Sequence, residues 1–466
     1  MSFGNHFQEN IPVKNVISAI DKYEKLILGA ERYIWAHPET GYKEFETSKY
    51  MAEKFEELGY KLTYAEGITG FYTVCDTGRP GPTLLILGEL DSIICPGHSA
   101  ANPDTGAVHA CGHNAQCAAL LGVAAALTEK DVIDGLSGKI KLCAVPAEEL
   151  LEIEYRTRLK SEGKIKYFGG KSEFLSRGYF DDVDLAFMVH TSTEFRSNLG
   201  FNGCIAKQII YKGTSAHAGG APWAGRNALY AATTGIAAAN ALRETFRDSD
   251  LIRFHPIITK GGDIVNAIPE EAKLESYIRG KTFAAMESAN ARINQALIGA
   301  AYSLGTNIEI IDMPGYSPLN NDPNMSLMAK EAYEKIFPER SFEISKTFTT
   351  GSTDMGDLSC IMPVVHPYSG GAVGTSHGSN YEIADPKAAC VDSAKWQVAM
   401  LTLLLENGAS RANEIIKNFK PLFPSVKEFL EYQDSICTSG NRIVYNGDGT
   451  TTILHKTFDD MSDGDL

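Results

Sequence analysis

The sequence predicts an α/β protein with a catalytic domain on a mostly parallel sheet and an inserted ferredoxin-like α+β domain. Two observations predict this class. Apolar strand-like runs alternate with helical patterns over the first third of the 466-residue chain, and the alternation resumes after about residue 315. Between these regions the order becomes strand, helix, strand, strand, helix, strand, which is typical of a split βαβ unit.

The elements of the first region follow from its apolar patterning. They are expected as helices at about 15–36 and 45–58, a strand at 83–90, a helix after residue 113, a strand at 139–146, a helix near 170–177 and a strand at 184–190. The strands are nearly continuous apolar runs such as "TLLILGEL", which indicates burial on both faces of a sheet.

The middle region is expected to form the inserted domain, residues 201–314. Its elements are expected as strands at 204–213, 251–260, 271–280 and 306–313, with helices at 225–244 and 283–305. Residues 1–200 and 315–466 then form the larger domain, with helices near 323–336 and 387–406 and a strand at 361–367. A C-terminal extension from about 410 contains a short helix and a hairpin candidate around Asn-Gly-Asp-Gly.

Composition excludes several classes of protein. The net charge of −15 and the lack of a basic stripe argue against nucleic-acid binding. No apolar run reaches the length of a membrane span, and the start "MSFGNHFQEN" does not resemble a secretory signal. The nine cysteines lack paired spacing, which indicates reduced thiols and a cytoplasmic location rather than a disulfide framework.

Charged or imidazole side chains follow three of the predicted strands at the point where each strand ends. Glu89 and Asp91 end the first, Glu148 and Glu149 the second, and His190 the third. Ligands of open α/β sheets bind at this carboxyl edge, so these groups are expected to share one crevice.

Two further segments are expected at the same edge. Cys111 and His113 immediately precede the alanine-rich helix, and His377 precedes a later one. A thiol, imidazoles and carboxylates together suit one or two transition-type divalent ions better than magnesium or calcium. Metal-assisted hydrolysis also needs a base, and two adjacent carboxylates can divide ligation and proton transfer. Asp91 is expected to orient His113.

Seven motifs then occur in the order of a known family. They are "HPETGYKEFETS", "GELDS", "HACGHNAQ", "VPAEE", "HAGGAPWAGRNAL", "GGDIVNAIPEEA" and "GSTDMGDLS". Over about residues 15–410 the chain resembles the binuclear metal-dependent aminoacylases, amidohydrolases and carboxypeptidases. Within them it is most similar to the branch of hippurate, indole-acetyl-amino-acid and p-aminobenzoyl-glutamate hydrolases.

The resemblance implies a role for each matching residue. Glu148 matches the general base. The residues that match the metal ligands are Cys111, His113, Glu149, His190 and His377. His217 matches a histidine of the smaller domain that reaches the active site of a second copy, and Asn266 and Arg279 match positions that hold the substrate's carboxylate or oxyanion.

Some features depart from the family pattern. Asn114 stands where the common motif has Asp, and Glu89 stands where Asp-x-Asp is commoner. The segments "SIICPGHSAANPDTGAV" and "LLEIEYRTRLKSEGKIKYF" are long and are expected to shape the substrate pocket. His98 is left as structural, and His109 as a pocket residue rather than a ligand.

The sequence therefore predicts a metal-dependent hydrolase that cleaves the amide bond of N-acyl amino acids or small dipeptides. It would hold two divalent ions per protomer, zinc or manganese first, with cobalt or nickel as alternatives, and would form a homodimer through the inserted domain. Two alternatives stay open: a cysteine amidase with Cys111 as nucleophile, and a non-catalytic binding homologue of the same fold.

Overall fold

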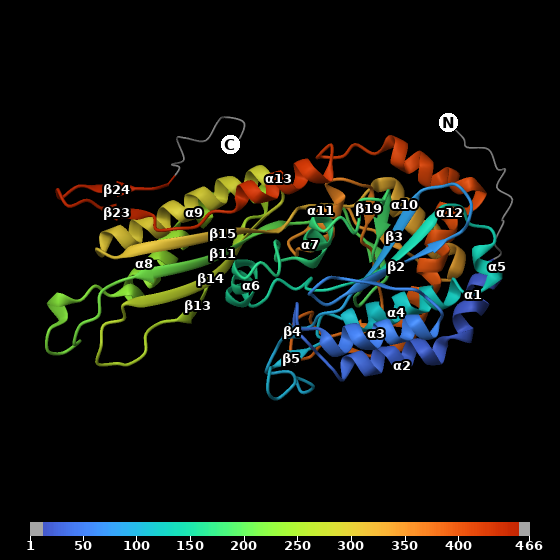
Figure 1. Cartoon of the computed structure of the whole chain (residues 1–466), viewed down its shortest axis with the longest axis horizontal. Coiled ribbons are helices and arrows are strands. Elements are labelled where there is room, and N and C mark those ends of the chain that lie inside the picture. The colour runs from blue at the N-terminus through green and yellow to red at the C-terminus, as the bar shows by residue number, and fades with distance from the viewer. Residues whose placement is uncertain (1–12, 456–466) are drawn as a thin grey trace.

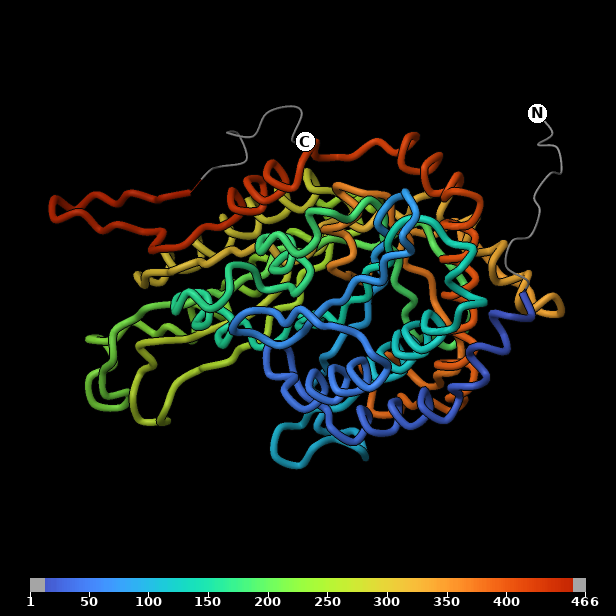
Figure 2. Tube along the Cα trace, turned by 45° about the vertical axis from the view of Figure 1, so that its right-hand side comes forward, coloured from blue at the N-terminus to red at the C-terminus, as the bar shows by residue number. Residues whose placement is uncertain are grey.

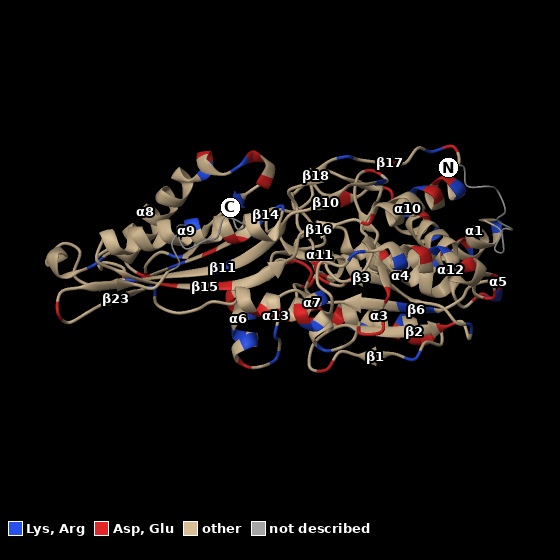
Figure 3. Ribbon diagram, turned by 90° about the horizontal axis from the view of Figure 1, so that it is seen from above, with Lys and Arg blue, Asp and Glu red and all other residues tan. Residues whose placement is uncertain are grey.

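The computed structural model describes residues 13–455, so the N-terminal decapeptide considered above lies outside the described residues. The molecule is elongated, with one sheet and most helices at one end and a second sheet with two long helices at the other (Figures 1 and 2). Basic and acidic residues are interspersed over both parts of the described chain (Figure 3). A cavity between these two parts is lined by Cys111, Glu148 and His190 of the larger part and by Arg279 of the smaller part.

The larger sheet has six strands in the order β1-β2-β6-β3-β7-β19. Their bounds are β1 (Thr63–Tyr64), β2 (Phe71–Asp76), β6 (Lys139–Val145), β3 (Thr83–Glu89), β7 (Leu185–Phe187) and β19 (Val364–Val365). The four strands from β6 to β19 are parallel, whereas β2 runs antiparallel to β6, and β1 to β2. The prediction of a mostly parallel sheet is confirmed.

Both faces of this sheet are covered, as its apolar strands predict. Leu84 and Ile86 of β3 belong to one core cluster, and Leu85 and Leu87 to another on the opposite face. The first cluster is completed by α1 (Val13–Lys22), α2 (Glu24–Trp35), α3 (Phe45–Glu57), α4 (His113–Ala126), α10 (Pro323–Ile336) and α12 (Ser393–Asn418). The second is completed by α7 (Gly170–Ser176), α11 (Met355–Ser359) and α13 (Val426–Ile436).

One helical stretch of the described chain, Lys387–Asn418, is long and apolar enough to cross a membrane by length and composition. It consists of a π-helical turn (Lys387–Asp392) followed by α12. Of its most apolar window, 94% is buried inside the protein, where it packs against α4 and α10. The apolar residues of this stretch therefore form part of the protein core.

The second sheet is antiparallel and has the order β12-β14-β11-β15, with β13 also pairing with β14. Its bounds are β11 (Gly203–Lys212), β12 (Arg253–Phe254), β13 (Ile257–Lys260), β14 (Glu271–Gly280) and β15 (Asn307–Tyr316). Helices α8 (Ala228–Ala241) and α9 (Phe283–Ser303) cover one face and enclose a separate core. Residues of β14 alternate between buried and half-buried, as expected for a sheet packed on one side. This is the predicted ferredoxin-like arrangement.

The C-terminal extension contacts the second sheet. After α13 the chain pairs with β15 at two isolated bridges, Glu309 with Asn441 and Asp312 with Thr438. The hairpin of β23 (Ile443–Tyr445) and β24 (Thr451–Ile453) confirms the turn signal, and Ile443 enters the second core. The extension thus covers the outer edge of β15, as Figures 1 and 2 show.

Several predicted elements are divided. The helix expected at 15–36 breaks at Tyr23, which leaves helical backbone (φ −105°, ψ 11°) and donates its hydroxyl to Glu129 at 2.7 Å. The strand expected at 251–260 forms β12 and β13, separated by His255 and Pro256, because proline lacks the N–H that the ladder needs. The strand expected at 184–190 ends at Phe187, and His190 begins a strand of another sheet.

Short strands and helices complete the fold. One small sheet, in the order β17-β9-β20-β8, contains β8 (His190–Thr191), β9 (Arg196–Ser197), β17 (Glu343–Ile344) and β20 (Tyr368–Ser369). The others are β10 (Gly200–Phe201) with β16 (Leu319–Asn320) and β18 (Phe348–Thr349), β4 (Ile93–Ile94) with β5 (Ala107–Val108), and β21 (Ala372–Val373) with β22 (Glu382–Ile383). The remaining α-helices are α5 (Lys130–Ile133) and α6 (Ile153–Ser161).

Candidate functional site

The carboxyl edge of the larger sheet opens into a cavity of about 640 Å³. Glu89 is the last residue of β3, Glu148 and Glu149 follow β6, and His190 follows β7. Six of the residues singled out in the sequence line the cavity: Cys111, Glu148, Glu149, His190, Arg279 and His377. Of the groups expected at the strand ends, Glu148, Glu149 and His190 share this crevice. Glu89, Asp91 and His113 are fully buried and do not line it.

The Cys-Gly-His turn delivers two side chains to this edge. Gly112 caps α4 with φ +89°, a left-handed conformation that favours glycine. A Cβ at this position would also collide with the hydroxyl of Tyr381 and lie 2.9 Å from Cβ of Thr191. Every residue of α4 is buried, so the helix is a rigid support that fixes Cys111 and His113 at its N-terminal end.

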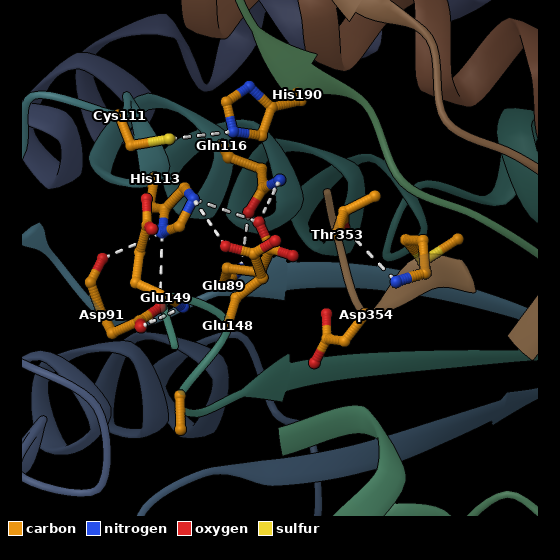
Figure 4. A network of polar contacts seen from close by, with 12 residues as sticks. Glu89, Asp91, Cys111, His113, Gln116, Glu148, Glu149, His190, Thr353 and Asp354 are labelled. Atoms are coloured by element: carbon orange, nitrogen blue, oxygen red, sulfur yellow. Dashed lines mark hydrogen bonds and ion pairs between the residues drawn. The ribbon is translucent and has the colours of Figure 1, made fainter. Parts of the chain in front are cut away.

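Cys111 belongs to two groups of potential metal ligands. It lies with His113 and His190 in one group and with Glu149 and His377 in the other, and within each group the ligand atoms lie within 4.8 Å of one another. Sγ of Cys111 is 3.4 Å from Nε2 of His190 (Figure 4), and Nε2 of His377 is 3.0 Å from Oε1 of Glu149. Two ligand groups that share one sulfur could hold two neighbouring ions.

The residues present fit such ions. Nε2 of His113 and Oε1 of Glu149 are buried and make no hydrogen bond within the described chain, although each lies near an ionisable group, Glu89 at 3.3 Å and His377 at 3.0 Å. Buried polar atoms without a hydrogen bond are costly unless something compensates them, and an ion would do so. Thiolate, imidazole and carboxylate are the ligands that zinc and related divalent ions prefer.

The electrostatics prepare these ligands for an ion. Burial and the Glu149 carboxylate oppose ionisation of the Cys111 thiol, yet the imidazoles of His190 and His113 lower its pKa to about 5. The carboxylate of Glu149 raises the pKa of His377 to about 12. Burial opposes ionisation of Glu149, but His377 holds its pKa below the usual range. The cluster therefore favours an anionic sulfur and carboxylate.

The pKa of Glu148 is shifted in the opposite direction from that of Glu149. Burial, Glu89 and Glu149 raise its pKa well above the ordinary value. Its Oε2 lies 3.9 Å from Nε2 of His113, and the hydroxyl of Tyr316 donates to its backbone carbonyl. Figure 4 shows the side chains of Glu148 and Glu149 together beside His113. A carboxyl group that holds a proton more tightly than usual is suited to general acid–base chemistry.

Asp91 orients two of these groups, as Figure 4 shows. Its backbone carbonyl lies 3.0 Å and its Oδ1 3.3 Å from Nδ1 of His113, and its Oδ2 accepts a hydrogen bond from the backbone N–H of Glu149 at 2.7 Å. With Nδ1 engaged in this way, Nε2 of His113 is directed toward Glu89 and Glu148.

The loop that carries Glu148 and Glu149 is braced by groups that the sequence analysis missed. The guanidinium of Arg156, 1% exposed, donates to the carbonyls of Glu149 and of Phe168, the latter at 2.7 Å. Glu44 accepts from the backbone N–H of Ala147 at 2.7 Å. Ala147 itself has φ +58°, so the loop needs external support. Arg156 comes from α6, in the second long segment, where no motif marks it.

A buried ion-pair network lies behind the site. Nζ of Lys171 is 2.5 Å from Oε1 of Glu89 and also contacts Asp354, and all three side chains are fully buried. Burial opposes both charges, but Lys171 lowers the pKa of Glu89 to about 2. The lysine thus keeps Glu89 anionic beside His113. Asp354 lies in the motif "GSTDMGDLS" and could have been noticed there, whereas nothing in the sequence distinguishes Lys171.

Two predicted site residues lie far from the cavity. His217 and Asn266 are exposed on adjoining loops beyond α8 and β13. The backbone N–H of Ala218 donates to the carbonyl of Asn266 at 2.9 Å, and His217 accepts from Gly220 N–H at 2.9 Å. Within this chain they therefore contact each other's loops and not the ligand cluster.

Residues that depart from the family pattern, or that were left without a catalytic role, make contacts within the fold. Asn114 donates to Glu31 at 2.8 Å, and His98 contacts the carbonyl of Tyr381 at 2.7 Å. His109 is buried, and burial lowers its pKa to about 3. Leu150 and Leu151 of the second long segment line the cavity as expected. The expectation for the first segment was wrong: none of its described residues lines the cavity, because 92–108 folds on itself around β4 and β5.

Comparison with known proteins places this site in a family. Residues 85–406, which include every predicted ligand and the base, match the family model described as peptidase family M20/M25/M40. The chain belongs to this family. The chain is accordingly an enzyme, a metal-dependent hydrolase of amide bonds, and the resemblance inferred from the seven motifs is confirmed.

Curated relatives of this M20-family enzyme are named for several amide substrates. It is 28% identical over 371 residues to the Xaa-Arg dipeptidase of Mus musculus, covering 75% of this chain and 77% of that one. It is 28% identical over 331 residues to indole-3-acetyl-aspartic acid hydrolase of Enterobacter agglomerans (59% and 71%). It is 27% identical over 328 residues to one polypeptide of the p-aminobenzoyl-glutamate hydrolase of Escherichia coli K12 (59% and 70%).

Solved structures share the fold of the M20-family chain. The aminobenzoyl-glutamate utilization protein of Klebsiella pneumoniae superposes with a TM-score of 0.63 at 19% identity, covering 83% of this chain and 98% of that one. A dinuclear metal binding peptidase of the M20 family from Bacillus subtilis gives a TM-score of 0.58 at 18% identity, covering 83% and 99%. The two-part architecture is therefore that of known M20 proteins.

Proposed function

We propose that this enzyme hydrolyses the amide bond of N-acyl amino acids or small dipeptides that carry a free carboxylate. The observation that carries the proposal is the shared sulfur of Cys111, which joins the two ligand groups beside the proton-accepting Glu148. His113 and His190 would complete one metal position, and Glu149 and His377 the other. Zinc or manganese suits these ligands best, and cobalt or nickel would also bind.

The two ions, when bound, lower the pKa of a water molecule and polarise the amide carbonyl. Glu148 takes the proton of that water and later delivers it to the leaving amine. Its raised pKa suits both steps, because burial and the neighbouring carboxylates make the group a stronger proton acceptor than an ordinary glutamate. Asp91 keeps Nδ1 of His113 engaged, so that Nε2 is available as a ligand.

The substrate's carboxylate is assigned to Arg279. This side chain lines the cavity and donates to the hydroxyl of Ser352 at 3.1 Å, and its other guanidinium N–H groups would be available to a carboxylate. A volume of about 640 Å³ suits an acyl amino acid or a dipeptide. Relatives named for such compounds support this class, although one is named for a cationic residue and two for acidic ones.

The functional unit is proposed to be a homodimer formed through residues 201–314. His217 and Asn266 are exposed on the part of the chain that lies away from the cavity, where a second copy could receive them. Trp223 and Val265, on the same loops, are 82% and 101% exposed, and large apolar side chains so exposed commonly mark an interface. In such a dimer His217 would donate to the developing oxyanion in the partner's site.

The larger unit, 1–200 with 315–466, is proposed as the metal-binding catalytic domain, with the extension from about 410 bridging both parts. A cytoplasmic location is proposed as well. All nine cysteines are free thiols, and several are buried in the core, which suits a reducing compartment.

A second candidate is a cysteine amidase. It is favoured by one observation: the thiol of Cys111, with a pKa near 5, lies 3.4 Å from His190, as in a nucleophile–base pair. Chelation separates the two functions. A metal hydrolase loses activity in chelator and regains it with the ion, whereas a cysteine amidase keeps its activity without metal.

The experiment for the main proposal is metal analysis followed by a substrate screen. The protein is stripped with chelator, reloaded with zinc, manganese, cobalt or nickel, and assayed with N-acyl amino acids and dipeptides, with amidated substrates as controls. We expect about two ions per chain and cleavage only of substrates with a free carboxylate. Full activity of the metal-free protein, or equal cleavage of amidated substrates, would contradict it.

A further inference from the structure

We propose that Arg196 selects substrates whose amino acid carries a second carboxylate, as in N-acyl aspartates and N-acyl glutamates. The inference rests on the proposed function and names the substrate class of the same site. Arg196 carries no role from the sequence motifs, and its side chain lines the catalytic cavity.

The position of Arg196 is fixed by a row of paired residues. In the small sheet, Tyr368 of β20 is opposite His190 of β8 on one side and opposite Arg196 of β9 on the other. Residues directly opposite each other on neighbouring strands project from the same face. All three line the cavity, and the guanidinium lies 5.7 Å from the ring centre of Tyr368.

Arg279 reaches the cavity in a corresponding way. In the second sheet, Cys204 of β11 is opposite Arg279 of β14 and also opposite Tyr316 of β15. These three residues line the cavity too, and the hydroxyl of Tyr316 contacts the carbonyl of Glu148. Each row therefore begins beside the catalytic cluster and reaches an arginine two strands away, roughly 10 Å across the sheet. Beyond the arginines the rows continue to Glu343 of β17 and to Arg253 of β12, which do not line the cavity.

Neither guanidinium forms an ion pair within the described part of the chain, although the exposed Glu343 of β17 is directly opposite Arg196 of β9. No ion pair involves Arg196 or Arg279, and the acidic side chains that line the cavity are Glu148 and Glu149 alone among the residues described. Both of these belong to the proposed metal and proton-transfer machinery. Outside that machinery the cavity is thus cationic, with two separate groups suited to carboxylates.

This charge distribution discriminates between amino acids. With Arg279 on the α-carboxylate, a substrate side chain that points toward the other row meets the Arg196 guanidinium. A carboxylate there gains a charge-assisted contact, and a neutral amide gains little. A cationic side chain meets a like charge, because the carboxylate opposite Arg196, that of Glu343, does not line the cavity. The expected order is therefore acidic above neutral above cationic.

The test compares matched substrates with the metal-loaded protein. kcat/KM is measured for the benzoyl and acetyl derivatives of Glu, Gln, Asp, Asn and Arg. We expect Glu to exceed Gln, and Asp to exceed Asn, by roughly 10- to 100-fold, the usual worth of a charge-assisted hydrogen bond. R196Q should reduce the Glu-to-Gln ratio to near one while leaving kcat/KM for Gln within about 3-fold of the wild-type value.

Two controls isolate the effect. R196K keeps the positive charge but not the bidentate guanidinium, and it should give an intermediate Glu-to-Gln ratio of kcat/KM. R158Q removes an arginine that is 65% exposed on α6 and should leave this ratio unchanged. Affinity for N-acetylglutamate, measured by calorimetry with the non-hydrolysing E148Q protein, should fall by a similar factor when R196Q is added. Equal cleavage of Glu and Gln derivatives, preference for Arg, or an unaltered ratio in R196Q overturns the inference alone. Failure to cleave any derivative overturns the proposed function as well.

Discussion

The sulfur of Cys111 lies 3.4 Å from Nε2 of His190. The same sulfur also lies within 4.8 Å of ligand atoms of Glu149 and His377, so Cys111 belongs to both groups of the candidate metal centre. Because of this relationship, we interpret Cys111 as a metal ligand shared by the two groups rather than as a nucleophile. The metal content and activity of a Cys111 variant can test that interpretation.

Cys111→Ser should remove metal as well as activity. Serine is a much weaker ligand than thiolate, so the metal content should fall below one ion per chain and hydrolysis should fall at least about 100-fold. The measurement is elemental analysis of the purified variant beside its rate. Cys117→Ala, at a buried cysteine in α4, is the matched control and should keep both ions. A Cys111→Ser protein with two ions and no activity would support the cysteine amidase instead.

Arg156→Ala should destabilise the protein by roughly 3–5 kcal/mol, because several buried carbonyls would lose a charged donor together. The carbonyls affected most are those of Glu149 and Phe168. Urea unfolding measures the loss. Arg158→Ala, two residues along α6 and exposed, should change the free energy of unfolding by less than about 0.5 kcal/mol. Equal effects of the two substitutions would show that the loop does not depend on Arg156.

His366 should make stability depend on pH. Burial, with a contribution from His190, lowers its pKa from the ordinary 6.5 to about 3. Between these values the unfolded chain binds a proton that the folded chain does not, so the free energy of unfolding decreases as pH falls. This histidine leaves the free energy of unfolding unchanged above about pH 6.5. Below that pH it lowers the free energy of unfolding by about 1.4 kcal/mol per pH unit.

The variant His366→Phe should remove this part of the slope between about pH 6 and pH 4. Urea midpoints of chelator-treated protein at each pH are the appropriate measurement, since metal release then adds nothing. His37→Gln, at a half-buried histidine, is the control. If His366→Phe and wild type show parallel pH profiles, the imidazole is not held neutral in the folded state.

Two inactive variants should complement each other if the proposed dimer is correct. Glu148→Gln lacks the base and His217→Ala lacks the donor, and in a mixed dimer one of the two sites receives neither change. Equal mixing with exchange of protomers should restore about a quarter of wild-type activity, because half of the dimers then hold one intact site. His217→Ala that is fully active, or a mixture that stays inactive after exchange, would contradict the shared site.

Much of the catalytic cluster could be predicted because its residues follow strand ends or short motifs. Cys111 and His113 precede an alanine-rich helix, and Glu148 and Glu149 follow an apolar strand, so local pattern fixes their place at the rim. The inserted sheet was likewise visible from the order of its elements. The antiparallel β2 was missed because its half-exposed residues give a weak apolar signal.

The supporting residues could not be predicted because their partners are distant in sequence. Lys171 meets Glu89 and Asp354, and Arg156 meets the base loop, only after α6 and α7 pack against the sheet. No sequence pattern marks Arg196 either, since its place in the cavity follows from strand pairing with Tyr368. Sequence patterns therefore reveal the residues that take part in the reaction. The residues that hold them in place become apparent only from tertiary contacts.

The most direct test of the whole account is the metal content and hydrolysis rate of Glu148→Gln, measured on the same preparation. Glu148 shares a third group of potential ligands with Glu89 and His113 but lies outside the two Cys111 groups proposed to hold the ions. The variant should therefore retain about two ions per chain and its wild-type affinity for substrate. Its kcat should fall by about 10³-fold or more, because the proton carrier is gone. A Glu148→Gln protein with both ions and full kcat would contradict the proposed mechanism.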